Sequence, residues 1–369
     1  MGLTSNTVLA LAIVAGVLLF AATVWFWPRL AGRTWRAVVG RVALLLATQL
    51  ALFSAIGLGA NKSFLFYGSW ADLFGQETEM GVVVDHSAGA KDIRVVDTRK
   101  LDVPGGANPA VGGLIQKVVV AGDRSKITTP GFVYLPPEYF QPQHAKEDFP
   151  AAVVLTGFPG IAENLIKGLD YPMTAYKQVK AGKMKPMILV MMRPTVAPPR
   201  DTECVDIPGG PQTETFFAKD VPQAVRESYR VGGKPANLAF VGNSTGGYCA
   251  LKMGIHHPGT FGVAVGLSAY YKAADDPTTG DLFHGDKALK QRADLLHSLK
   301  QKAPTKTSFL VTTSKKGEDN FRPTKQFIKD VKSPDRVSSI VLDSGGHNFN
   351  TWRREIAPML VWLSGRLQA

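Results

Sequence analysis

Residues 237–258 read NLAFVGNSTGGYCALKMGIHHP. A short apolar run is followed by the pattern G-x-S-x-G at 242–246 and then by a helix-length segment. A serine on a sharp strand-to-helix turn adopts a strained backbone, and glycines two positions before and after it let neighbouring chains pass close. The pattern therefore predicts that Ser244 is a nucleophile. The simpler alternative is a glycine-rich turn without one.

Short apolar runs alternate with helix-length segments on both sides of this motif. Continuous apolar runs suit strands that are buried on both faces of a parallel sheet, and the segments between them supply the covering helices. We therefore predict an α/β-hydrolase fold in residues 114–369, with a mostly parallel central sheet and helices on both faces. The strands are expected near 116–122, 130–136, 151–156, 186–192, 237–242, 262–268, 307–313 and 337–343, and helices near 173–181, 217–228, 246–257, 288–300, 323–332 and 351–367.

The N-terminal part of the chain has a different character. Residues 7–27 and 42–60 are apolar and carry no charge, and each is long enough for a helix across the ~30 Å hydrocarbon layer of a membrane. Lipid offers no partners to backbone groups, so we predict a hairpin of two transmembrane helices as a membrane anchor in residues 1–60. Residues 61–113 then form a juxtamembrane connector, which has room for an edge hairpin.

The residues between the two apolar stretches predict the orientation of this anchor. Positive charges favour the cytoplasmic side of a membrane, so both chain ends and the catalytic domain are expected outside the cell membrane. The alternative is a cleaved secretory signal, but residues 1–6 lack the Lys or Arg that such a signal carries. The positive charges between the two stretches are Arg29, Arg33, Arg36 and Arg41.

The remaining charge and the cysteines limit the classes of partner. The net charge is +12, yet no nucleic-acid recognition motif accompanies it, so we predict no nucleic-acid partner and a solvated basic surface. No His or Cys pair has metal-ligand spacing, and no metal or other cofactor is predicted. The two cysteines, Cys204 and Cys249, are compatible with one disulfide in an oxidising compartment. Whether they are bonded does not follow from the sequence.

Position in the chain selects the catalytic base and reduces the candidates for the catalytic acid to two residues. The α/β-hydrolase fold requires the order serine, acid, histidine, and of the seven histidines only His347 follows the last predicted strand. The acid belongs after the strand near 307–313, where Glu318 and Asp319 both qualify. We favour Asp319 and keep Glu318 as the alternative. His256 and His257 end the helix after Ser244 and are better interpreted as residues that interact with its dipole.

An acyl transfer also needs two backbone N–H groups aimed at the developing oxyanion. One is the amide of Thr245, the residue after the nucleophile. The second is expected after an early strand, where the sequence AAVVLTGFPG places Phe158, since the proline that follows has no N–H. The alternative interpretation of this segment is a plain Gly-Pro turn.

The order GFPG, GNSTGG, a late acid and GGHNFNTW resembles the esterase D and antigen 85 group of α/β-hydrolases, in particular membrane-anchored esterases of actinobacteria. The resemblance covers roughly residues 115–369. It implies Ser244 as the nucleophile, His347 as the base and the amides of Phe158 and Thr245 as the oxyanion hole. One departure is Thr156, which stands where many hydrolases have a histidine, and this puts the pocket shape in doubt more than catalysis.

The resemblance also draws attention to the segment RDTECVDIPGGPQTETFFAKDVPQAV at 200–225. In the resembled group this region lines the approach to the active site, which implies that Asp201 and Glu203 lie near the cleft. The simpler interpretation of both residues is solvated loop carboxylates, and we prefer it here.

These observations favour a serine-dependent ester hydrolase that acts outside the membrane through an acyl-serine intermediate on an ester or acyl-lipid substrate. An acyltransferase of the mycolyltransferase type would use the same triad, with a sugar hydroxyl in place of water. A third possibility is a non-catalytic, membrane-tethered envelope protein, because a fold alone does not prove activity. The acyl length, the alcohol portion and the oligomeric state do not follow from the sequence.

Overall fold

The computed structural model describes residues 3, 5–64, 70–73, 92–198 and 200–368. The chain divides into two compact units, Met1–Met80 and Gly81–Ala369, and each is described by itself. Of the segment predicted as a connector, residues 65–69 and 74–91 lie outside the described residues. The predicted division into anchor, connector and catalytic domain stays a prediction.

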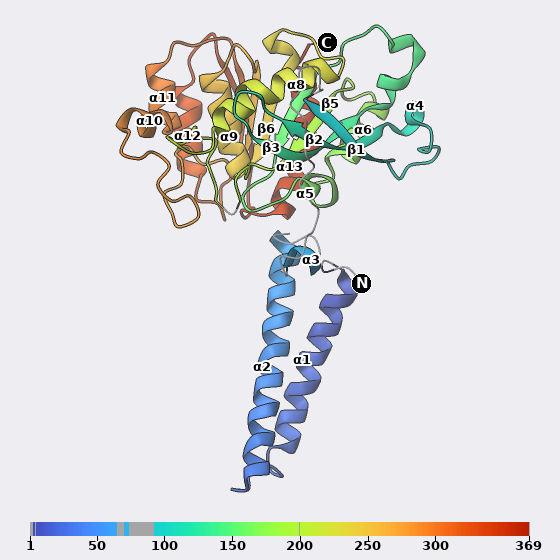
Figure 1. Ribbon diagram of the computed structural model, residues 1–369, viewed down its shortest axis with the longest axis vertical. Helices are drawn as coiled ribbons and strands as arrows, with labels where there is room; N and C mark the ends of the chain where they lie inside the picture. The colour runs from blue at the N-terminus through green and yellow to red at the C-terminus, as the bar shows by residue number, and fades with distance from the viewer. Residues whose placement is uncertain (1–2, 4, 65–69, 74–91, 199, 369) are drawn as a thin grey trace. The chain divides into compact units, whose positions relative to one another are not determined.

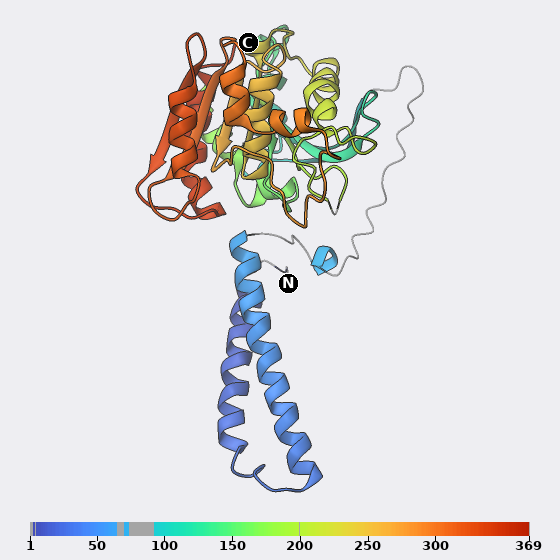
Figure 2. The ribbon, with the colours of Figure 1, turned by 90° about the vertical axis from the view of Figure 1, so that its left-hand side faces the viewer.

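Two long helices run side by side in the first unit, α1 (Asn6–Phe26) and α2 (Trp35–Phe64), and a short helix, α3 (Trp70–Leu73), follows them (Figures 1 and 2). Both long helices are apolar and long enough to cross a membrane. A hydrogen bond of 3.0 Å between the hydroxyls of Thr23 and Thr48 joins them. Helix α2 begins earlier than the predicted residue 42 because Thr34 caps it, accepting a hydrogen bond from the amide of Ala37 at 3.3 Å.

A mixed sheet forms the centre of the second unit, with the strand order β1-β2-β3-β5-β4-β6-β7-β8-β9 among the described residues. Neighbouring strands from β5 to β9 are parallel, and β1, β2 and β3 form an antiparallel edge that joins β5. The mostly parallel sheet is as predicted. The strands are β1 (Ile93–Arg99), β2 (Leu114–Ala121), β3 (Thr128–Leu135), β4 (Ala151–Leu155), β5 (Ile188–Met192), β6 (Leu238–Asn243), β7 (Val263–Leu267), β8 (Ser308–Ser314) and β9 (Arg336–Leu342).

Helices cover both faces of this sheet, as predicted (Figure 1). The longer ones match the predicted ranges except near 288–300, where Asp294 accepts a hydrogen bond from the amide of His297 and starts a second helix. The helices are α4 (Pro109–Gly112), η1 (Pro137–Phe140), η2 (Pro142–His144), α5 (Glu163–Lys167), α6 (Tyr171–Lys180), α7 (Thr213–Thr215), η3 (Phe216–Asp220), α8 (Val221–Ser228), η4 (Pro235–Asn237), α9 (Thr245–His256), α10 (Lys287–Arg292), α11 (Leu295–Gln301), α12 (Phe321–Asp330) and α13 (Phe349–Ser364).

Strand β8 shows which helices share a face. Successive side chains of a strand point to opposite faces of its sheet. Phe309 meets Phe327 of α12 and lies against α9, whereas the hydroxyl of Thr312 donates to Glu355 of α13 at 2.8 Å. Helices α9 and α12 therefore cover one face and α13 covers the other.

The sheet begins inside the segment that was interpreted as a connector. Strand β1 pairs with β2 from Ile93 to Arg99, with a bulge between Val95 and Asp97. The sequence signal was weak because most of the strand is exposed, so it lacks the apolar run that marks the central strands.

Helix α9 packs so closely on the sheet that it has no room for a side chain at Gly254. A Cβ there would lie 2.6 Å from the Cβ of Ala264 and 2.8 Å from the ring of Phe309. Gly254→Ala should therefore lower the free energy of unfolding by on the order of 1 kcal/mol, although alanine is the better helix former. Chemical unfolding of the full chain in detergent measures this.

Gly259→Ala is the matched control, since nothing lies within 4 Å of a Cβ built at this exposed turn. Its free energy of unfolding should stay within about 0.5 kcal/mol of the wild type. A Gly254→Ala variant as stable as the control would show that α9 packs less tightly than described.

Candidate active site

Ser244 stands on a strained turn between β6 and α9. Its backbone has φ 55° and ψ −123°, and its amide donates a hydrogen bond of 3.0 Å to the carbonyl of Leu267. A Cβ on Gly242 would lie 2.3 Å from backbone atoms of Gly246, and a Cβ on Gly246 would lie 2.5 Å from the carbonyl oxygen of Leu155. Both glycines of the motif are therefore required by close packing, which holds the half-buried Ser244 at the end of its strand.

His347 lies within hydrogen-bond distance of Ser244. Its Nε2 is 2.8 Å from the Ser244 Oγ, and it comes from the loop between β9 and α13. The imidazole packs edge to face on Trp352, with ring centres 5.2 Å apart, and the Trp352 indole N–H donates to Ser268 at 2.8 Å. Partial burial lowers the pKa of His347, and the negative charge of Asp319 opposes this. The imidazole is therefore neutral near pH 7 and can accept a proton from Ser244.

The loop after β8 is fastened to the loop that carries His347. Gly317 has φ 94°, and a Cβ there would lie 2.4 Å from the carbonyl oxygen of Gly345. The amide of Gly345 donates to the carbonyl of Lys316 at 3.1 Å. The two loops thus pack backbone to backbone, and this brings the segment that follows Gly317 close to the loop of His347.

Of the two candidate acids, the structure brings Glu318 to His347, and not the favoured Asp319. The Glu318 Oε1 is 3.9 Å from the His347 Nδ1, and its side chain is 1% exposed, whereas Asp319 is exposed. This distance is too long for a hydrogen bond and makes an ion pair once His347 is protonated; catalytic hydrogen bonds are often this long before substrate binds. Burial raises the pKa of Glu318, and the nearby hydroxyls of Ser268 and Ser314 oppose this rise. Sequence position cannot separate adjacent residues whose side chains point in different directions.

Two backbone amides are available beside Ser244. Gly157 approaches it so closely that a Cβ there would lie 2.8 Å from the Cβ of Ser244, and Phe158 is the next residue. Neither the amide of Phe158 nor that of Thr245 donates a hydrogen bond to any residue that the structure describes. Thr156, the departure from the resembled group, is buried, and its hydroxyl donates to the carbonyl of Gly157 at 2.6 Å. The arrangement leaves two donors free for an oxyanion.

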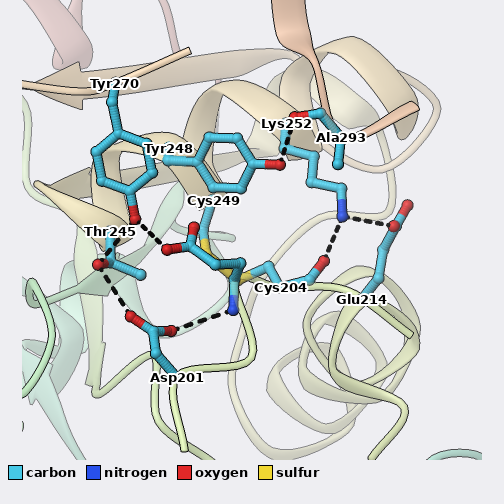
Figure 3. Close-up of a disulfide and its surroundings, with 10 residues drawn as sticks. Asp201, Cys204, Glu214, Thr245, Tyr248, Cys249, Lys252, Tyr270 and Ala293 are labelled. Atoms are coloured by element: carbon cyan, nitrogen blue, oxygen red, sulfur yellow. Dashed lines mark hydrogen bonds and ion pairs between the residues drawn. A yellow bond between two sulfur atoms is a disulfide. The ribbon is translucent and has the colours of Figure 1, made fainter. Parts of the chain in front are cut away.

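The segment at 200–212 is fastened to α9 next to this site. A disulfide joins Cys204 to Cys249, with 5.7 Å between their Cα atoms (Figure 3). Asp201 and Glu203, interpreted above as solvated, are instead buried with 2% and 1% of their surface exposed. The disulfide explains the difference, because it pulls the segment onto the helix that begins beside Ser244. No pattern in a loop sequence reports such burial.

A second group of ionisable side chains lies farther along α9. Burial alone would raise the pKa of Glu214, but Lys252, His257 and Arg292 hold it far below its usual range. Lys252 is fully buried 3.0 Å from Glu214, and the His257 Nε2 is 2.7 Å away. We interpret this cluster as an ion-pair network that secures the loop. No group of three or more His, Cys, Asp or Glu in the described parts of the chain is arranged to hold a metal ion.

The chain is similar to known proteins in sequence and in fold. Residues 125–363 match the profile of the family described as "Putative esterase". The chain is 25% identical over 275 residues to an uncharacterised protein of Corynebacterium glutamicum, and the alignment covers 69% of this chain and 62% of that protein. The chain thus spans less than two thirds of the length of this relative.

Three solved structures share the fold. The first is a ferulic acid esterase (TM-score 0.58, 18% identity, 69% of this chain and 98% of that one). The second is an S-formylglutathione hydrolase from Agrobacterium tumefaciens (TM-score 0.60, 16% identity, 74% and 100%). The third is the fluorophosphonate-binding serine hydrolase F of Staphylococcus aureus (TM-score 0.55, 14% identity, 68% and 98%). At these identities the similarity is one of fold.

The two acids should affect the reactivity of Ser244 differently. Glu318→Gln should slow its modification by an organophosphonate about 10³-fold or more at every pH, because the imidazolium loses its partner. Asp319→Asn should keep the limiting rate and move the acidic limb to lower pH, since the Asp319 charge raises the pKa of His347. The measurement is the modification rate of the full chain against pH. The opposite pattern would assign the acid role to Asp319.

Proposed function

The chain belongs to the esterase family, and we propose that it cleaves ester bonds through an acyl intermediate on Ser244. The 2.8 Å contact between the Ser244 Oγ and the His347 Nε2 carries the proposal. A serine hydroxyl is a weak nucleophile until a neighbouring base takes its proton, and this contact supplies the base.

The described geometry supports each step of this reaction. His347 takes the proton as Ser244 attacks the ester carbonyl, and Glu318 stabilises the imidazolium that forms. The amides of Phe158 and Thr245 stabilise the oxyanion of the tetrahedral intermediate. The imidazolium then gives its proton to the leaving alcohol. Water repeats the sequence on the acyl-serine and releases the free acid.

We also propose that α1 and α2 anchor the protein in the cell membrane, with the esterase unit outside. Many of their apolar side chains are exposed in the structure, for example Phe20 at 59% and Leu50 at 70%. A lipid bilayer would cover these side chains. Arg29 and Arg33 lie between the helices, where the preference for positive charge on the cytoplasmic side sets the orientation.

The orientation predicts which part of the chain a protease can reach. Protease added to intact spheroplasts should degrade residues 92–368, while an epitope inserted between Arg29 and Arg33 should survive until the membrane is permeabilised. An epitope that is cleaved in intact spheroplasts would invert the topology. Recovery of the mature protein without residues 6–26 would instead show that α1 is a cleaved signal.

Labelling with a fluorophosphonate probe tests the catalytic proposal. The full chain in detergent should be labelled, and Ser244→Ala should abolish labelling because the attacking oxygen is gone. His347→Ala should reduce the rate of ester hydrolysis about 10⁴-fold or more. His297→Ala is the matched control, since His297 is exposed on α11, and it should keep full activity.

The products of the reaction show whether water or another acceptor receives the acyl group. A series of p-nitrophenyl esters of increasing acyl length should yield free acid as the main product, and addition of a sugar should leave this unchanged. A new sugar ester as the main product would identify the protein as an acyltransferase. No labelling of a well-folded wild type would remove the enzyme proposal and leave the tethered, non-catalytic alternative.

A further inference from the structure

Two buried carboxyl groups lie close to Thr245, the residue that follows the nucleophile. Asp201 (Figure 3) and Glu203 belong to the segment that the disulfide fastens to α9. Glu203 and Cys204 have φ values of 48° and 46°, a region that residues other than glycine rarely adopt. The Lys252 ammonium donates to the carbonyl of Cys204 at 2.5 Å and helps to hold this conformation. Both acids are buried on a loop with a strained backbone, which the disulfide and Lys252 hold in place. Such burial suggests a role other than solubility.

A chain of short contacts connects the two acids through Tyr270 and Thr245. The Tyr270 hydroxyl is 2.6 Å from the Glu203 Oε1 and 3.0 Å from the Thr245 Oγ1. The Thr245 Oγ1 is 3.3 Å from the Asp201 Oδ2. The backbone amide of Glu203 donates to the Asp201 Oδ1 at 3.1 Å. The cluster therefore touches the side chain of Thr245, whose amide is a proposed oxyanion donor.

Counting hydrogen atoms shows how many protons this series of hydrogen bonds needs. Tyr270 has one hydroxyl hydrogen, so it cannot donate to both Glu203 and Thr245. If Glu203 is protonated, it donates to Tyr270, Tyr270 donates to Thr245, and Thr245 donates to an ionised Asp201. Each contact then contains one hydrogen. If both acids are ionised, the two hydroxyl hydrogens must serve three contacts, so one of the three contacts has none.

The charges that face Glu203 agree with this count. Burial and then the charge of Asp201 raise the pKa of Glu203 to about 8, against the hydrogen bond from Tyr270, the amide of Ala274 and the positive charge of Lys252. Burial also raises the pKa of Asp201, and the nearby Asp276 adds to this. Tyr248 stacks on Tyr270 and stays neutral, because burial raises its pKa well above the usual value.

We propose that Asp201 and Glu203 together hold one proton near neutral pH, and that this proton, through Tyr270, orients Thr245 beside the nucleophile. Asp201, Glu203 and Tyr270 are thus positioning residues for the oxyanion hole, and the proposal rests on the ester hydrolysis proposed above. Loss of the shared proton removes a hydrogen from the chain and places a second negative charge behind the oxyanion hole. Both changes oppose a negatively charged transition state, so kcat falls as the proton leaves.

The pH dependence of kcat in the full-length protein tests this proposal. The wild type should lose about tenfold in kcat as the pH rises from 7 to well above 8. Glu203→Gln should keep kcat at pH 7 within about threefold and lose this alkaline fall, because the amide donates to Tyr270 at every pH. Glu203→Ala should be slow throughout, since it removes the donor. A Glu203→Gln variant with the wild-type alkaline fall would overturn the proposal.

A second variant keeps the test independent of how well Glu203→Gln folds, and a spectrum detects the shared proton directly. Asp201→Asn should also lose the alkaline fall, because its amide can donate to Thr245 at every pH and the pair then carries at most one negative charge. An infrared difference spectrum of wild type minus Glu203→Gln at pH 7 should contain the C=O stretch of a protonated carboxyl, and its absence would overturn the proposal. If the fluorophosphonate probe labels the wild type, either failure refutes this inference alone. If it does not label, the esterase proposal itself has failed.

Discussion

Three backbone segments meet around Ser244, and the candidate site depends on how closely they pack. Gly242, Gly246 and Gly157 each lie where a Cβ would be within 3 Å of a neighbouring atom. Glycine at these positions lets the Ser244 backbone take its positive φ, lets α9 begin against β4, and lets the Phe158 loop reach the serine. A larger residue at any of them would move the nucleophile away from the amides of Phe158 and Thr245. These amides could then no longer lie within ~3 Å of the oxyanion that forms on the attacked carbonyl.

The parallel order of the central strands brings the remaining parts to the same place. Strands β4, β6, β8 and β9 run in one direction, so the loops that leave their carboxyl ends lie along one edge of the sheet. These loops carry Phe158, Ser244, Glu318 and His347. Each side chain therefore depends on a rigid strand before it and on a close loop contact beside it, such as that of Gly317 with Gly345.

The position of each site residue after a strand explains which features the sequence could predict. Apolar runs mark the central strands, and the order of elements selects Ser244 and His347 because each follows a strand that can be recognised. The acid is different, because Glu318 and Asp319 follow the same strand, and only the direction of each side chain separates them. The exposed strand β1 and the early start of α2 depend on edge pairing and capping, which leave weak sequence signals.

The burial of Asp201 and Glu203 could not be predicted for a further reason. It results from a contact between residues 45 positions apart, the disulfide, and from the buried ion pair of Lys252 with Glu214. Burying ionised groups is costly unless each is paired. The Lys252 charge balances Glu214, so it offsets little of the charge on the two acids. A retained proton is the least costly way to bury the second carboxyl, and it leaves that group able to donate a hydrogen bond toward Thr245.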